Sequence, residues 1–237
     1  MIRAVLSALT ALSLTLAANT ARADGPVVVE LYTSQGCSSC PPADELLAQL
    51  ADRDDVIALG LHVDYWDYIG WADTFADHQF TLRQQSYARV AGAGMVYTPQ
   101  MIIGGADHVV GNRPMEVADT ISAHRGLSYP VAINISHEGG IYTIEARTEM
   151  APPRPDMLVQ LVRFMPHSEV EIARGENAGR NAEYHNIVRS WQVIGEWDGG
   201  RPFIGRVQPQ DDLPLAVIVQ AAGPGRILGA MRLPRED

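Results

Sequence analysis

The only two cysteines among the 237 residues, Cys37 and Cys40, are separated by Ser38-Ser39. A C-x-x-C pair between a strand and the start of a helix is typical of thiol–disulfide chemistry. The positive dipole end and the unpaired N–H groups of a helix stabilise a thiolate, so the first cysteine becomes nucleophilic near neutral pH. The second lies close enough to resolve a mixed disulfide. We therefore predict that Cys37, the more exposed of the two, is the nucleophile and that Cys40 is the resolving thiol.

The segments on either side of the cysteines have the patterns that this chemistry requires. Residues 27–33 form an apolar, β-branched run, which predicts a buried strand. After the motif, apolar residues recur at helical spacing, which predicts a helix from Cys37 to about Ala51. The motif is therefore expected at a strand–helix junction.

Two other roles of the cysteine pair remain as alternatives. A disulfide across so short a loop removes little chain entropy from the unfolded state, so a purely structural bridge explains the spacing poorly. Soft thiolates also select Cu(I), and a copper carrier would need a further ligand, for which the chain offers His62, His78, His108 and Met101. A Cu(I)-binding carrier and a binding module with an inert disulfide therefore stand beside the redox interpretation, which needs no cofactor and no metal.

The amino-terminal residues have the pattern of a secretory signal peptide. Arg3 is followed by an apolar run over residues 4–18 and by the small-residue cleavage pattern Ala21-Arg22-Ala23. The run is shorter than the roughly 20 apolar residues that span a bilayer, and no later stretch qualifies. We therefore expect residues 1–23 to be removed and the protein to be exported, periplasmic or secreted, and soluble.

The charge of the chain limits its partners. The formal net charge is −10, and every basic residue other than histidine is arginine. Without residues 1–23, the 18 basic residues become 16 against 28 acidic ones, so the net charge is −12. The absence of lysine excludes Schiff-base chemistry. An acidic chain without a basic cluster argues against nucleic acid and anionic membranes as partners, which leaves a protein or a small thiol or disulfide as the expected substrate.

The pattern of predicted secondary structure changes near residue 127. Strand-like and helical runs alternate before it, which indicates an α/β domain over residues 24–127. After it, short runs separated by Gly, Pro and Asp predict an all-β antiparallel sandwich of about seven strands over residues 128–237. The further expected elements before the change are 56–63, 74–90, 100–104, 109–110 and 114–124. The expected strands after it are 131–135, 141–146, 157–164, 169–173, 185–194, 203–207, 215–221 and 226–231.

The first of these domains resembles the thioredoxin fold, in which a cis-proline faces the C-x-x-C pair. Here Thr98-Pro99 precedes an apolar strand and a glycine turn. The resemblance therefore implies a cis bond between Thr98 and Pro99, placed beside the sulfurs. The segment between Cys37 and Pro99 is longer than a minimal thioredoxin core, which places a helical insertion at about residues 64–90. The expected fold class is an α/β thioredoxin-like domain followed by an all-β antiparallel sandwich.

More narrowly, the chain resembles an exported thioredoxin-like family that is catalogued as a domain of unknown function (domain of unknown function 1223). The segments that carry this resemblance are residues 30–44, 62–71, 97–100, 175–180 and 185–189. It extends from about residue 27 to the carboxyl terminus and implies a fold but no substrate.

Glu30 is a candidate proton acceptor because disulfide oxidoreductases often keep a buried acid on the strand beneath the motif. A carboxyl group in apolar surroundings has a raised pKa, which suits a base that deprotonates Cys40. The alternative is that Glu30 faces solvent at the end of the strand or pairs with an arginine.

Two further groups of residues are candidates for binding. Tyr65, Trp66 and Trp71 follow a predicted strand, at the edge of an α/β sheet where ligands bind, and are predicted to contact the substrate. Their alternative is a local aromatic cluster that packs the inserted helix. The polar segment of the second half is interpreted as an ion-pair network or an interface with the first domain, with an anion or partner site as the alternative. Its members are Arg174, Glu176, Asn177, Arg180, Glu183, Tyr184, His185, Asn186 and Arg189. The sequence thus predicts an exported thiol–disulfide oxidoreductase.

Overall fold

The computed structural model of the protein describes residues 25–233. The predicted signal peptide, residues 1–23, lies outside the described residues. Among residues 25–233, no helix is both long and apolar enough to cross a membrane.

The first half of the chain alternates strands and helices, as the sequence predicts. Strand β1 runs parallel to β2 with Val27 opposite Val56, and antiparallel to β3 with Leu31 opposite Met101. Helix α1 begins at Pro41, later than the predicted start at Cys37, and buries one face through Leu47 and Leu50. The elements are β1 (Val27–Thr33), α1 (Pro41–Ala51), β2 (Val56–His62), the short 3-10 helix η1 (Asp67–Ile69), α2 (His78–Val90), β3 (Gln100–Ile103), β4 (Asp107–Val110) and α3 (Pro114–Arg125).

The second half contains only strands among its described residues. They are β5 (Val131–Glu138), β6 (Ile141–Thr148), β7 (Met157–Glu171), β8 (Asn181–Trp197), β9 (Phe203–Val207), β10 (Leu215–Ala221) and β11 (Ile227–Arg232). Two strands expected at residues 157–164 and 169–173 form one long strand, β7, which continues through Pro166.

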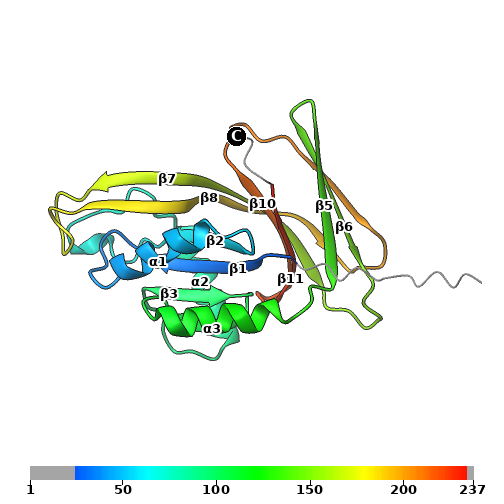
Figure 1. The fold of residues 1–237 in the computed structure, drawn as a ribbon, viewed down its shortest axis with the longest axis horizontal. Helices are drawn as coiled ribbons and strands as arrows, with labels where there is room; N and C mark the ends of the chain where they lie inside the picture. The colour runs from blue at the N-terminus through cyan, green and yellow to red at the C-terminus, as the bar shows by residue number, and fades with distance from the viewer. Residues whose placement is uncertain (1–24, 234–237) are drawn as a thin grey trace, which may run out of the picture.

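The expected fold class is wrong. The strands of the second half do not form a sandwich of their own, because most of them extend the sheet of the first half. One mixed sheet has eight strands in the order β11-β10-β7-β8-β2-β1-β3-β4, and a smaller sheet has three in the order β5-β6-β9. Figure 1 shows the long β7–β8 hairpin lying alongside β2 and β1, with β5 and β6 at the other end of the molecule.

The two halves join where β8 meets β2. The strands pair in parallel at Gly60 and Ile187. A side chain at Gly60 would have its Cβ 3.3 Å from the carbonyl oxygen of His185, so glycine permits the close approach. Asn186 adopts a left-handed backbone with φ 46°, which asparagine tolerates better than most residues, and its Nδ2 donates to the carbonyl oxygen of Ala58 at 2.9 Å.

Three clusters of buried apolar side chains hold the two sheets and the helices together. Alternate residues of β1 point to opposite faces of the large sheet, so Val29 and Leu31 pack with α1 and α3, whereas Val28 and Tyr32 pack on the side of α2. A third cluster joins the small sheet to β7, β10 and β11. The arrangement places the cysteine motif in the loop between the carboxyl end of β1 and the amino-terminal end of α1.

Candidate functional site

Cys37 and Cys40 are joined in a disulfide with their Cα atoms 5.4 Å apart. Cys37 is only 2% exposed and Cys40 is fully buried, whereas Ser38 and Ser39 between them are exposed. Cys37 is thus the more exposed of the two, as predicted, but only slightly, and the exposed atoms of the loop belong to the two serines.

The start of α1 offers fewer hydrogen-bond donors to a thiolate than the sequence analysis assumed. Cys40 is the N-cap residue, and Pro41 and Pro42, which have no N–H, occupy the first turn. The N–H groups of Ala43 and Asp44 both donate to the carbonyl oxygen of Cys40, at 2.8 Å and 3.1 Å. The Oγ of Ser39 lies 3.4 Å from the Sγ of Cys37. The helix dipole and the Ser39 hydroxyl are therefore the groups placed to stabilise a Cys37 thiolate.

A loop from the second half covers the motif. This covering loop, residues 172–180, connects β7 to β8. Its Asn177 is 4% exposed, and the Nδ2 of that residue donates to the carbonyl oxygens of Gln35 at 2.9 Å and Cys37 at 3.0 Å. The interface interpretation of the polar segment is thus confirmed for Asn177 and Asn186. The interpretation as an arginine–glutamate network has no such support, because the salt bridges seen among residues 25–233 include none of the arginines and glutamates of that segment.

Thr98, which precedes Pro99, contacts the loop that carries the two cysteines. The Thr98–Pro99 bond is cis, as predicted. The hydroxyl of Ser39 donates to the carbonyl oxygen of Thr98 at 3.5 Å, and the indole N–H of Trp66 donates to the Thr98 hydroxyl at 2.7 Å. The structure therefore brings Thr98 and the motif together, although 59 positions separate Ser39 from Thr98.

The three predicted aromatic residues form hydrogen bonds through their polar atoms, and those of Trp66 and Trp71 reach segments beside the motif. The indole N–H of Trp71 donates to the Oε1 of Gln35 at 2.8 Å, and the Tyr65 hydroxyl donates to Gln84 at 3.1 Å. All three rings are half-buried, and Tyr65 and Trp66 pack against the core beside α2. The cluster interpretation thus has direct support, and the predicted contact with substrate stays a prediction.

Glu30 lies on the face of β1 that points away from α1. Arg83 of α2 binds its carboxylate with two N–H groups, at 2.7 Å and 2.9 Å, and the hydroxyls of Tyr32 and Tyr87 donate to it at 2.9 Å and 2.7 Å. Glu30 is fully buried, so this pairing with arginine, the alternative in the sequence analysis, satisfies a charge that burial would otherwise destabilise.

A different acid lies beside the motif. Asp44 follows Cys40 by four residues in α1, so the two share one face of the helix. Burial raises the pKa of Asp44 to about 7, against the attraction of His62 and the hydrogen bond from the Thr33 hydroxyl, both of which lower it. That hydroxyl donates to the Oδ1 of Asp44 at 2.8 Å. Sequence reasoning missed Asp44, although its spacing from Cys40 was a usable signal.

A cavity of about 360 Å³ opens between the amino-terminal end of α1 and the outer part of β8. Both halves of the chain line it: Ser34, Pro41, Asp44, Glu45, Ile172, Asn177, Arg180, Asn181, Ala182, Glu183 and Tyr184. Asp44 therefore faces a space that a ligand can enter, next to the covering loop.

The residues considered as copper ligands make contacts of other kinds. The Nδ1 of His62 lies 2.7 Å from the Oδ2 of the buried Asp73, and that of His78 lies 2.8 Å from Asp64. The ring of His108 packs edge-on against Tyr87, and Met101 is buried in the core beneath α1. The contacts of these four side chains provide no observation in favour of the copper alternative.

Comparison with known proteins places the chain in a family. Two solved structures match. The protein AGR_C_4864 from Agrobacterium tumefaciens has 34% identity and a TM-score of 0.77, over 89% of this chain and 95% of its own. HBP35 of Porphyromonas gingivalis has 14% identity and a TM-score of 0.64, over 88% of this chain and 74% of its own, a likeness of fold alone. The search of curated proteins found no match. Residues 28–220 match the family described as protein of unknown function (DUF1223), and the chain belongs to that family.

Proposed function

We propose that the protein is an exported thiol–disulfide oxidoreductase that exchanges its Cys37–Cys40 bridge with a protein or small-molecule thiol. The observation that carries the proposal is a disulfide at a strand–helix junction whose buried N-cap cysteine has an acid one helical turn away, with a cavity beside it. A bridge that closes so short a loop contributes little to stability, so exchange explains it better than cross-linking.

The reaction can be written as a balanced exchange of two electrons. A thiolate of the client attacks the Sγ of Cys37, the Cys37–Cys40 bond breaks, and a client–Cys37 disulfide forms while Cys40 leaves as a thiolate. A second client thiolate then attacks the client sulfur of the mixed disulfide and releases the Cys37 thiolate. The client dithiol is oxidised and the protein disulfide is reduced, and the same steps in reverse reduce a client disulfide.

Asp44 supports this exchange by handling the proton of Cys40. In the forward direction its neutral carboxyl group gives a proton to the leaving Cys40 thiolate, and in reverse its carboxylate accepts the proton of the Cys40 thiol. A pKa of about 7 suits both tasks at neutral pH. We assign this role to Asp44 rather than Glu30, because Thr33 and Asp44 lie on the side of β1 that faces α1, whereas Glu30 is bound by Arg83 on the other side.

The test of the proposal is the trapping of the first intermediate. A Cys40→Ser variant cannot close the bridge, so incubation with glutathione disulfide should add one glutathione to Cys37, measured by mass spectrometry of the intact protein. A reduced peptide dithiol should then remove the adduct. Failure of Cys37 to form the adduct in a folded Cys40→Ser variant, while denatured protein forms it, would contradict the proposal.

Separate variants distinguish the two acids. Asp44→Asn should slow exchange of the wild-type bridge by a factor on the order of 10², the low end for one general acid–base group, while leaving alkylation of Cys37 nearly unchanged. Glu30→Gln is the matched control, since it also neutralises a buried acid near the motif. If Glu30→Gln slowed exchange and Asp44→Asn exchanged at the wild-type rate, the role would return to Glu30.

A further inference from the structure

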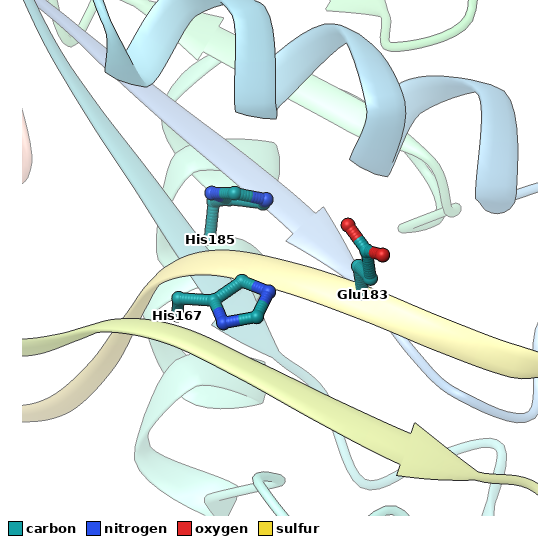
Figure 2. A group of neighbouring side chains, drawn as sticks. All are labelled: His167, Glu183 and His185. Carbon is teal, nitrogen blue, oxygen red and sulfur yellow. The ribbon is translucent and has the colours of Figure 1, made fainter.

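The outer part of the β7–β8 hairpin brings together three side chains that can bind a metal ion. His167 lies on β7, and Glu183 and His185 lie on β8. Their ligand atoms all lie within 4.8 Å of one another. Figure 2 shows His185 and Glu183 projecting to the same side of β8, with His167 beside them. Two imidazoles and one carboxylate thus converge from adjacent strands.

The strand pairing determines this convergence. His167 stands directly opposite His185 in the antiparallel register, and Glu183 is two residues from His185, so the two share a face of β8. The two imidazole rings have centroids 4.9 Å apart and planes inclined by 57°, so they are not stacked in parallel. The metal ligands therefore come from positions that the sheet itself aligns.

The backbone of this region is also held from the other side. His185 is adjacent to Asn186, whose side chain anchors β8 to β2 through the carbonyl oxygen of Ala58. The carbonyl oxygen of His185 lies against Gly60 of β2. His185 is half-buried, whereas His167 and Glu183 are exposed. One ligand thus has a fixed backbone between two strands, and the other two have room to close on an ion.

We propose that His167, Glu183 and His185 form a binding site for a divalent transition-metal ion, with Zn²⁺ as the ion that fits the ligand set best. Imidazole nitrogen is a preferred ligand of zinc, copper and nickel, whereas Mg²⁺ and Ca²⁺ prefer oxygen ligands. Two histidines and a carboxylate leave the fourth position of a tetrahedral zinc ion open to water or an added ligand. This site uses no sulfur and goes beyond the proposed redox function.

The observed spacing is compatible with this coordination after small side-chain rotations. Zinc–nitrogen bonds of about 2.0 Å put tetrahedral ligand atoms about 3.3 Å apart. The present separations of up to 4.8 Å therefore have to shorten by about 1.5 Å at most, which the exposed His167 and Glu183 can supply.

The test is a titration of the oxidised full chain with zinc chloride by isothermal calorimetry. Oxidation matters because Cys37 and Cys40, the only cysteines, are then bonded to each other and present no thiolate to the metal. We expect one zinc ion per chain. His167→Ala and His185→Ala should each weaken zinc binding at least about tenfold. Loss of a group that only hydrogen-bonds to a metal ligand already costs about that much, and loss of a ligand itself should cost more.

His78→Ala is the matched control, because His78 is an exposed histidine paired with the carboxylate of Asp64 and is not part of the proposed cluster. It should bind zinc as the wild type does, and magnesium chloride should give no comparable binding. Zinc should also raise the unfolding temperature of the wild type but not of His167→Ala. Absence of stoichiometric zinc binding, or unchanged binding in a folded His167→Ala variant, would overturn the proposal.

Discussion

The raised pKa of Asp44 predicts a particular dependence of stability on pH. The value rises from 3.8 to about 7 on folding. Between these two pH values, the folded protein holds a proton that the unfolded chain has released. The contribution of Asp44 to the free energy of unfolding is therefore fully present below pH 3.8 and is lost as the pH rises to about 7. The gap between the two values corresponds to about 4 kcal/mol at 1.36 kcal/mol per pH unit.

The perturbation is Asp44→Asn, which keeps an oxygen for the hydroxyl of Thr33 and removes the titrating group. Other charges that act on Asp44 are those of His62, Asp73 and Glu45, and all of them stay in the variant. Relative to wild type, the variant should gain about 3 kcal/mol of unfolding free energy between pH 4.5 and pH 7, where the wild type loses the contribution of Asp44.

The assay is urea unfolding of both oxidised proteins from pH 4.5 to pH 8. Taking the difference between them removes contributions common to both, such as that of His108, whose pKa burial lowers. It also removes those of Asp73 and Asp64, whose lowered pKa values act below this range. Parallel curves for the two proteins would refute the reasoning, because Asp44 would then titrate alike in the folded and unfolded states.

Three further predictions concern the surroundings of the motif. Asn177→Ala should cost about 1–3 kcal/mol, because it removes the side-chain donor to the buried carbonyl oxygen of Gln35 and one of two donors to that of Cys37. It should also speed reduction of the bridge by dithiothreitol, whereas the exposed Asn134→Ala should do neither. Arg83→Met should cost about 3–5 kcal/mol in urea unfolding by leaving a buried carboxylate unpaired, and addition of Glu30→Gln should recover part of that loss. Trp66→Leu should raise the KM for a peptide dithiol about fivefold, for a lost aromatic contact of about 1 kcal/mol; an unchanged KM would leave the ring as a brace of the motif.

Local patterns predicted most individual elements of the fold. The bounds of β1, β9 and β10 agree with the expected 27–33, 203–207 and 215–221, because Gly, Pro and Asp on either side of a short run of strand-forming residues mark where the strand begins and ends. The joining of the two halves had no such signal. It combines the pairing of Gly60 with Ile187, the side-chain anchor from Asn186 and a shared apolar cluster, whose members are far apart in the sequence.

Pro166 illustrates how a local rule was overridden. A proline has no N–H for a ladder, so it favours a break between two strands. Here Pro166 falls between the pairs Met165–Ile187 and His167–His185, opposite Asn186, whose backbone is left-handed. The ladder therefore skips one position and β7 continues.

The candidate site could be predicted only in part from the sequence, because some of its features depend on contacts between distant segments. The cysteine pair and the cis bond at Pro99 were predicted, because motif chemistry and resemblance both concern short segments. The face on which an acid of β1 lies depends on strand alternation, and a one-residue difference in register moves Glu30 from one face to the other. The cover that Asn177 provides depends on the path of a hairpin from the other half of the chain.

The central claim, that the Cys37–Cys40 bridge exchanges with thiols, is tested most directly by its reduction potential. The folded protein would be equilibrated with glutathione and dithiothreitol buffers of known potential, and the fraction of dithiol would be counted by alkylation and mass spectrometry. A redox-active bridge predicts a reversible two-electron midpoint in the range of about −270 to −120 mV that exchange proteins cover. A bridge that stays oxidised below about −300 mV, as structural disulfides do, would contradict the account.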